Sequence, residues 1–564
     1  MCAASWNEQE KGLLIPLERF RWRRMWILLV GPLVLGLGLR GQPQTVIRTN
    51  VHVVEVSVVA TGVNGAPAGG LAARDFRVWD NGKEQTIANF EKAGSPPAAG
   101  GVEMPPAARG VETPPAAYSN RVAGAASDGS SKSRPQVLSM IVLDAVNTKY
   151  RFQTVARRAV ERILDQLDPG QRVAIYAMGS RLRIIHDFSS DKASLLTKLR
   201  AYQGEVPNRD DLLEDLELDD KAGPGITTRK PCKPRTDPET PLELVNLQAR
   251  ILDTLGALEA LANQVKGVPG RKNLLWMTGA FPVSVGQLAL AGPIIAPSVG
   301  SNRPSPFQAN RNYAAEMKRT MAVLNDAAVS VYPIDARGLS CNPDVNINIG
   351  AMRDFADATG GKAFYNRNDL ETGVRAALDD SREVYVLTYS PQPMVADGAY
   401  HTIRVQSSRR GVQLRYRQGY YAPGRDEAAG SAGPADRLAE VVSSPVDASE
   451  IGIQAAVEQA GDDIALAIHV DPAGVNLVPN AARWAGALRL EAMQLGAAGE
   501  LLGGVNQAAK LNLEEATYQR DLRQGLPFEM KFRREPGAIA VRIGVVDERG
   551  AHTGSVSVPL PPLP

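Results

Sequence analysis

This 564-residue sequence contains few of the residues from which metal centres and reactive sites are built. Its three cysteines and five histidines are scattered, with no CxxC pair and no cysteine–histidine cluster of zinc spacing. Aromatic residues make up 5% of the chain, and the formal net charge at pH 7 is +2. These scarcities exclude a structural zinc domain. They also argue against nucleic-acid binding, because single-strand binders combine basic patches with aromatic residues.

The sequence also lacks the local motifs of common catalytic sites. It has no G-x-S-x-G nucleophile turn, no Walker A phosphate loop and no H-E-x-x-H zinc motif. No acidic pair lies in a recognisable glycosidase context. We therefore expect a protein without catalytic residues. The alternative is a hydrolase whose site the sequence does not reveal, for example one that uses the 203–241 segment.

One apolar run lies near the N-terminus. Residues 25–39 are apolar apart from glycines and one proline, and the basic stretch Arg21-Trp-Arg-Arg24 precedes them. Such a run is short for a membrane-spanning helix and fits the apolar part of a secretory signal. We expect residues 1–43 to be a signal peptide, with a membrane anchor through 25–39 as the alternative. Either predicts an exported chain, in the periplasm, at the cell surface or secreted.

Composition and periodicity divide the rest of the chain into six segments. They are 44–92, an N-terminal β segment; 93–135, an Ala/Gly/Pro/Ser-rich linker; 136–381, alternating strands and helices; 382–422, a β extension; 423–446, a second linker; and 447–564, a β-sandwich-like domain. Neither 44–92 nor 382–422 has enough strands to bury a face alone. We therefore expect these two segments to pack together as one β module.

A polar excursion at 203–241 interrupts the alternating region. Residues 209–220 are acidic and residues 229–235 are basic. A long segment of this kind is either functional or solvated. Calcium binding is conceivable, but the oxygen spacing matches no EF-hand loop. Cys232, in this segment, and Cys341 lie in predicted loops, where they either pair in an oxidising compartment or remain free thiols.

The alternation in 136–381 predicts a Rossmann-like α/β fold, an open, mostly parallel sheet with helices on both faces. The expected strands are 137–143, 172–178, 182–185, 273–277 and 329–334, with a short sixth near 362–365. The expected helices are 150–167, 190–202, 242–265, 313–327, 351–359 and 370–379. Ligands of such sheets bind at the carboxyl ends of the strands. Asp144 and Thr148 follow the first strand directly, so they lie where this fold places its sites.

The landmarks of this region resemble those of a von Willebrand factor type A domain. They are the first strand ending in Asp144, Asp168-Pro-Gly-Gln-Arg-Val-Ala-Ile-Tyr176, Arg271-Lys-Asn-Leu-Leu-Trp-Met-Thr-Gly279 and Val331-Tyr-Pro-Ile-Asp335. Three further stretches are similar to the acidobacterial "VWFA-related" proteins: Asp75-Phe-Arg-Val-Trp-Asp-Asn-Gly-Lys-Glu-Gln-Thr-Ile87, Tyr385-Val-Leu-Thr-Tyr389 and Arg417-Gln-Gly-Tyr-Tyr421. The resemblance covers residues 45–423 and implies type A architecture flanked by all-β modules.

The resemblance also implies a metal-ion-dependent adhesion site, in which a D-x-S-x-S turn offers oxygen ligands to Mg²⁺. Asp144 matches the first acid of that turn, and Thr148 replaces the second serine. Val146 stands at the first serine and cannot ligate. After Thr278, Gly279 stands where the motif has an acid. We therefore predict a degenerate site with Asp144 and Thr148 as its metal residues, and weak or no Mg²⁺ binding.

The sequence leaves two points about this site undecided. The loop threonine of the motif has four candidates, namely Thr227, Thr228, Thr236 and Thr240. The alternative role for Asp144 is structural, as a turn or helix N-terminal carboxylate bonded to backbone N–H groups. Asp335 ends the fifth strand near the same edge and is more often a structural turn acid.

The combined expectation is an exported, non-enzymatic protein that binds an unidentified protein partner in an adhesion-type role. No nucleic-acid partner is expected, and residues 25–39 would provide a membrane tether if they are retained. The alternative is a structural or sensor scaffold subunit of a cell-envelope complex, in which the type A domain has a purely structural role.

Overall fold

The structure is a computed structural model. It describes residues 53–93, 118–120, 137–205, 241–281, 313–339, 345–391, 399–422 and 433–561, apart from 64, 169–170, 269, 280, 381, 445, 481–482, 498 and 551. The predicted signal peptide, most of the 203–241 segment with its candidate threonines, Cys232 and Cys341 lie outside the described residues.

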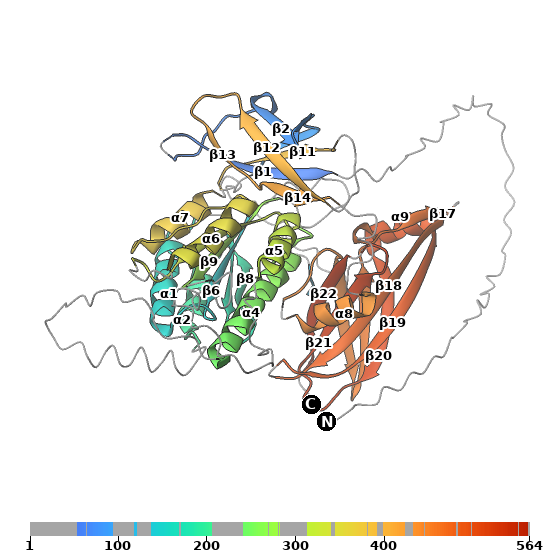
Figure 1. The fold of residues 1–564 in the computed structure, drawn as a ribbon. Helices are drawn as coiled ribbons and strands as arrows, with labels where there is room; N and C mark the ends of the chain where they lie inside the picture. Colours follow the sequence, from blue (N-terminus) through green and yellow to red (C-terminus); the bar gives the residue numbers. More distant parts are fainter. Residues whose placement is uncertain are drawn as a thin grey trace, which may run out of the picture. The chain divides into compact units, whose positions relative to one another are not determined.

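A five-stranded sheet forms the centre of the 136–381 region (Figure 1). Its strands, in spatial order, are β8 (Leu182–Ser189), β7 (Arg172–Met178), β6 (Leu138–Asp144), β9 (Lys272–Thr278) and β10 (Val329–Asp335). All neighbours pair in parallel except β7 and β8, which are antiparallel. This is the doubly wound order, with β6 and β9 at the switch point. The predicted α/β fold is therefore confirmed.

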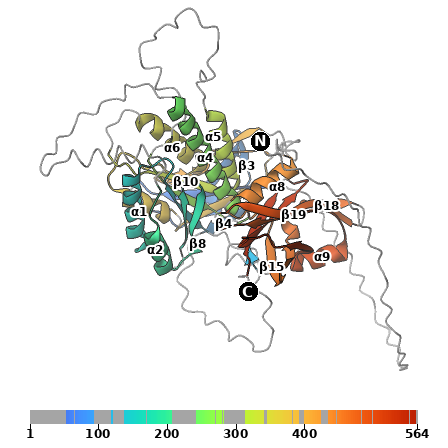
Figure 2. The same ribbon diagram turned by 90° about the horizontal axis from the view of Figure 1, so that it is seen from below.

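Helices cover both faces of this sheet, as Figures 1 and 2 show. On one face lie α4 (Pro241–Val265), α5 (Ala314–Asp326) and α6 (Val345–Thr359); on the other lie α1 (Tyr150–Leu164), α2 (Lys192–Ala201) and α7 (Leu370–Asp379). Successive strand residues point to opposite faces. Accordingly, Met140 and Val142 of β6 join the core under α4, and Ile141 and Leu143 join the core under α1.

The edges of this sheet differ in detail from the sequence prediction. The third strand runs to Ser189 and is antiparallel, because only a short turn after Met178 connects it to β7. The sixth strand expected near 362–365 is reduced to one parallel bridge between Ile334 and Phe364.

Two four-stranded sheets form a β module from segments about 300 residues apart. One sheet has the order β13 (Gln413–Arg415), β1 (Val54–Thr61), β11 (Val384–Tyr389), β4 (Asn89–Ala93); the other has β14 (Gly419–Tyr421), β12 (Tyr400–Ser407), β2 (Phe76–Asp80), β3 (Lys83–Gln85). Each sheet thus combines strands from both segments. Asn81 and Gly82 have positive φ values of 46° and 80°, as the tight β2–β3 hairpin requires.

Two sheets enclose the core of the C-terminal domain. One has the order β20 (Leu526–Arg533), β16 (Asp463–Val470), β15 (Ile453–Ala460), β5 (Tyr118–Ser119). The other has β17 (Val478–Asn480), β18 (Arg483–Leu495), β21 (Ala540–Asp547), β22 (Thr553–Pro559), and β19 (Leu501–Glu514) also pairs with β18. Helix α9 (Glu515–Gln524) follows β19.

Both segments expected to be linkers contain ordered elements. Helix α8 (Pro434–Ser443) lies within 423–446 and buries Leu438, Val441 and Val442, which have helical spacing. A proline at its first position suits a helix start. The helical spacing covers only a few residues in a Gly/Ala-rich segment, so the sequence did not predict this helix. Within 93–135, β5 pairs with β15, and Asn120 donates to Ala448 O and Ile451 O at 2.7 and 2.8 Å. A two-residue strand carries no sequence pattern.

Candidate functional site

The carboxyl edge of the central sheet brings together Asp144, Thr278 and Asp335. Each is the last residue of its strand, and the parallel register places Asp335 opposite Thr278. The loop after β6 carries Asn147 and Thr148 to the same edge. Ligand-binding sites in doubly wound sheets form at this edge, and Asp144 and Thr148 lie there in the structure.

Asp144 is only 2% exposed, and its carboxylate accepts hydrogen bonds from other groups of the chain. Asn147 N donates to Oδ1 at 2.9 Å, and Asn147 Nδ2 and Trp276 Nε1 donate to Oδ2 at 2.9 Å. Burial raises the pKa of Asp144, whereas hydrogen bonds from Asn147, Thr278 and Trp276 act in the opposite direction. Both carboxylate oxygens are therefore already engaged inside the protein.

Thr148 is also committed to an internal contact. Its side chain is buried, and its Oγ1 accepts a hydrogen bond from Gly279 N at 2.8 Å. A Cβ at position 279 would lie 2.9 Å from Asn147 O and 3.1 Å from Thr148 Cα. The close approach of these two loops leaves no room for a side chain, which explains why glycine replaces the acid of the motif.

Trp276 and Thr254 complete the network, and sequence reasoning missed both. Asn147 Nδ2 also donates to Thr254 Oγ1 on α4 at 2.8 Å. The Trp276 ring packs edge-on against Phe281 and Phe355, with centroids 5.4 and 5.8 Å away. An indole is a donor only, and its place inside a buried strand was the one available signal that it would need an acceptor.

Asp335, at the end of β10, forms an ion pair with the nearby Arg337. Asp335 is fully buried, and its carboxylate accepts from Arg337 Nε at 2.9 Å and Arg337 Nη2 at 2.8 Å. This two-pronged geometry is the strong form of an arginine–carboxylate pair. Asp335 therefore offers no free oxygen toward the edge.

These side chains do not fit a divalent cation. Mg²⁺ requires near-octahedral oxygen ligands, but the oxygens of Asp144, Thr148 and Asp335 accept protein hydrogen bonds, and Val146 packs in the core. Asn147 Oδ1 is buried with no hydrogen-bond partner among the described residues. A cavity of about 20 Å³ beside Asp144 and Thr148 has room for roughly one water molecule. In the described part of the chain, no group of three or more His, Cys, Asp or Glu residues could hold a metal.

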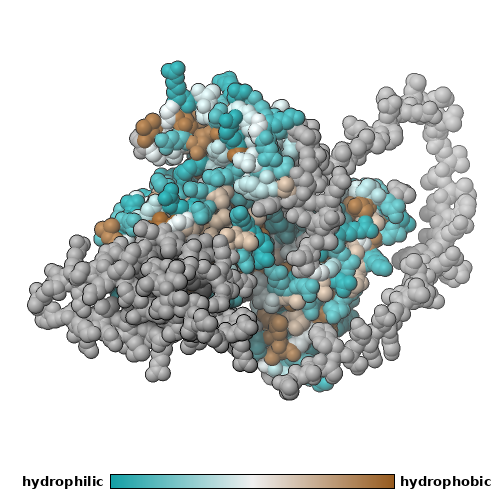
Figure 3. Space-filling view, in the orientation of Figure 1, coloured by the Kyte–Doolittle hydropathy of each residue, from teal (hydrophilic) through white to brown (hydrophobic). Residues whose placement is uncertain are grey.

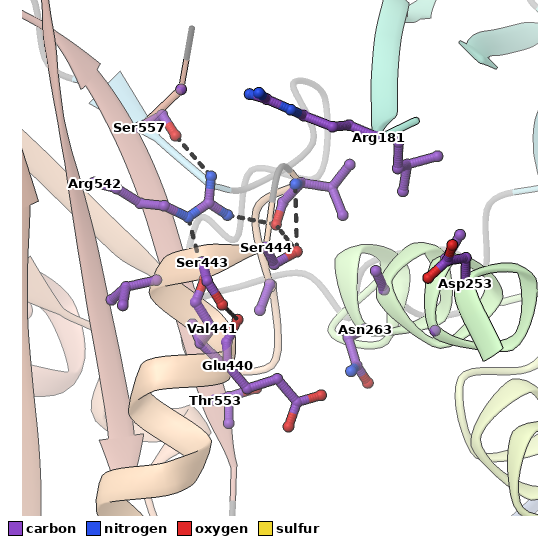
Figure 4. A pocket seen from close by; sticks show the side chains of 18 of the residues that line it. Arg181, Asp253, Asn263, Glu440, Val441, Ser443, Ser444, Arg542, Thr553 and Ser557 are labelled. Carbon is purple, nitrogen blue, oxygen red and sulfur yellow. Dashed lines mark hydrogen bonds between the residues drawn. The ribbon is translucent and has the colours of Figure 1, made fainter. Parts of the chain in front are cut away.

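A larger cleft, of about 1020 Å³, lies elsewhere (Figure 4). Its wall includes α4, the β7–β8 turn, α8 and strands of the C-terminal domain. Arg542 crosses one side, where it donates to Val441 O at 3.1 Å and to Ser557 Oγ at 3.0 Å and pairs with Asp447 at 3.2 Å. Burial lowers the pKa of Arg542, and the Asp447 charge opposes this effect.

The lining of this cleft favours no single chemistry. Four cations and three anions line it, so neither sign of charge strongly dominates: Arg181, Lys266, Arg437 and Arg542 stand with Asp253, Glu440 and Glu450. No histidine or cysteine is among the described residues that line it. Its residues come from segments up to about 380 positions apart, which is why sequence reasoning did not find it.

Comparisons with known proteins find similar solved structures, and type A domains are among them. No protein-family model matches the sequence, and no curated protein matches it. Similar solved structures include a von Willebrand factor type A protein from Catenulispora acidiphila, with 10% identity, coverage of 75% of this chain and 65% of that chain, and a TM-score of 0.24. They also include the von Willebrand factor domain of the type V pilus tip protein Mfa5 from Porphyromonas gingivalis, with 12% identity, 43% and 92% coverage, and a TM-score of 0.24.

A third similar structure is proximal thread matrix protein 1 from the mussel byssus, with zinc in its MIDAS motif. Its identity is 10%, coverage is 44% of this chain and 47% of that chain, and the TM-score is 0.23. This chain thus spans about half of the mussel protein. Von Willebrand type A domains are among the structural neighbours, and the strand order of the central sheet is the doubly wound order expected of such a domain.

Proposed function

We propose that this chain is an exported, non-enzymatic interaction protein of adhesion type. Its type A domain is the scaffold, and its metal-ion-dependent adhesion site is degenerate. One observation carries the proposal: Asp144, Thr148 and Asp335 are bonded to other groups of the chain, at the edge where this fold binds ligands. A partner would then meet a preformed surface rather than a coordinated ion. The proposed domain limits are those expected from the sequence, except that β5 and α8 belong with the C-terminal domain.

Exposed apolar side chains suggest where contact with a partner occurs. Tyr150, at the start of α1, and Leu339, after β10, are 37% and 64% exposed near the carboxyl edge. On the face drawn in Figure 3, the described surface is mostly hydrophilic with small separated apolar groups. Isolated apolar residues are ordinary on protein surfaces; two at a ligand-binding edge point to a small, metal-independent docking surface.

A protein partner that co-purifies with this chain is expected to bind it equally well in EDTA and in Mg²⁺. Leu339→Asp should weaken this binding roughly tenfold, because a buried apolar contact contributes about 1–2 kcal/mol. The matched control is Val63→Asp, which changes an 81% exposed residue of the β module. Titration of the purified partner by calorimetry measures both effects. Binding abolished by EDTA would reject a metal-independent surface, and equal loss in the two variants would reject this edge.

Export is the second part of the proposal. The basic stretch before residues 25–39 supports it. In the described part of the chain, no helix is long and apolar enough to cross a membrane. Fractionation of cells should recover the chain outside the cytoplasm. Recovery of a soluble cytoplasmic chain that retains Met1 would contradict this proposal.

The alternatives make different predictions. A scaffold subunit of a cell-envelope complex would be recovered in that complex, and its loss would destabilise the other members. The hydrolase alternative has one local contact in its favour, because His186 Nε2 lies 2.7 Å from Ser194 Oγ. However, His186 Nδ1 faces Asp187 O at 2.6 Å rather than a carboxylate. Hydrolysis that Ser194→Ala abolishes in a broad screen would favour this alternative.

A further inference from the structure

Strand β19 is long and has one open edge. One side of this 14-residue strand pairs with β18 along its whole length, from Arg483 to Leu495 (Figure 1). Among the residues that the structure describes, no strand pairs with the other side. Neighbouring residues of an antiparallel strand direct their N–H and C=O groups to opposite sides. About half of the backbone groups of β19 therefore face the open edge.

This edge lacks the usual protection against pairing. Proteins shield edge strands by shortness, prolines or repeated charges. Residues 501–513 contain no proline and one charge, Lys510. Leu501 and Leu502, at the beginning of the strand, are 46% and 37% exposed. A long edge of this composition is a template for a further strand.

The core beneath the open edge is incompletely covered. Val505, Leu511 and Leu513 point between the two sheets and are only partly buried. On the facing sheet, Phe528 and Phe532 of the edge strand β20 are also partly buried. An added strand beside β19 would cover these side chains, and removing their apolar surface from water favours association.

We propose that β19 pairs antiparallel with β19 of a second copy of this chain, about a twofold axis at Ala508. In this register Val505 lies opposite Leu511 of the second copy, on the core-facing side. On the outer side, Asn506 lies opposite Lys510. No two like charges face each other in this register. Each contact occurs twice, once on either side of the axis, as a twofold interface requires. The contact joins two sheets into one.

Charge placed on the twofold axis tests the proposal directly. Sedimentation equilibrium of the full chain, in density-matched detergent because of residues 25–39, should show a dimer. Ala508→Lys and Ala508→Glu each place two like charges opposite one another and should weaken association at least tenfold. An equimolar mixture of the two variants should recover the dimer. Ala508 is exposed, so both variants are expected to fold, which circular dichroism checks.

The control is Ala467→Glu, on the exposed face of the central strand β16, and it should leave association unchanged. Asn506→Glu tests the register, because it places a carboxylate opposite Lys510 on each side of the axis and should tighten association about two- to tenfold. A monomeric wild-type chain would overturn the proposal. Ala508 variants that associate as the wild type does would also overturn it, because they would place the contact on another surface or with another partner.

Discussion

Asp144→Ala is expected to lower the free energy of unfolding by roughly 3–5 kcal/mol, the usual cost of removing one partner from a buried charged network. The substitution leaves Asn147 N, Asn147 Nδ2 and Trp276 Nε1 without this acceptor at a buried position. Denaturant unfolding followed by circular dichroism measures the change. The effect would be far larger than that of a solvent-exposed capping residue.

Two further variants sharpen this result. Asp144→Asn keeps the shape of the side chain but turns an amide donor toward one of the existing donors, so it should cost nearly as much as alanine. Asp191→Ala is the matched control: Asp191 caps the exposed N-terminus of α2 by accepting from Ala193 N at 3.0 Å. Its loss should cost about 1 kcal/mol. Equal effects at positions 144 and 191 would contradict the network.

Magnesium distinguishes the structural role of Asp144 from metal binding. A ligand stabilises the folded state by RT ln(1 + [L]/Kd). If the oxygens are already engaged, millimolar Mg²⁺ should leave the melting midpoint of the wild-type protein unchanged. A midpoint that rises with Mg²⁺ in the wild type, and not in Asp144→Ala, would show that the ion displaces the protein donors.

The position of Asp144 in the fold could be predicted from the sequence, but its hydrogen-bond partners could not. Asp144 ends an apolar run and precedes a helix, and that local pattern is sufficient to place it at the carboxyl edge of the sheet. Its partners Trp276 and Thr254 lie 132 and 107 residues away in the sequence from Asp144 and from Asn147, respectively. Only folding brings them into contact, so the sequence showed which ligands were missing and not which donors replaced them.

In the fold, too, elements with a strong local pattern could be predicted, and features that depend on distant residues could not. Strands β6, β7, β9 and β10 are mainly apolar, and buried parallel strands have this pattern. Helix α8 has ten residues and strand β5 has two. The sequence did not predict them, because segments this short show little periodicity when the residues around them are rich in Gly and Ala. The open edge of β19 is a property of sheet order, which no local pattern encodes.

The β module depends on a buried polar cluster around Asp80, the last residue of β2. Its Oδ1 lies 2.8 Å from His401 Nδ1 on β12, and its Oδ2 accepts from Tyr389 OH at 2.9 Å and Tyr420 OH at 2.7 Å. Burial and the Asp80 charge raise the pKa of both tyrosines, so they remain protonated donors. The Asp80 carboxylate therefore links β2, in the first segment, to β11, β12 and β14, in the second segment.

Asp80→Ala is expected to destabilise the β module by roughly 3–5 kcal/mol, because two phenols and an imidazole lose their common acceptor in the interior. Both strands that pair with β1, namely β11 and β13, belong to the second segment, so β1 depends on that segment for its place in a sheet. Hydrogen exchange should therefore rise together in residues 54–61 and 384–389. Glu84→Ala, which breaks an exposed ion pair with Arg77 in the same hairpin, should change little. Exchange that rises in 76–85 alone would show that the two segments do not unfold as one unit.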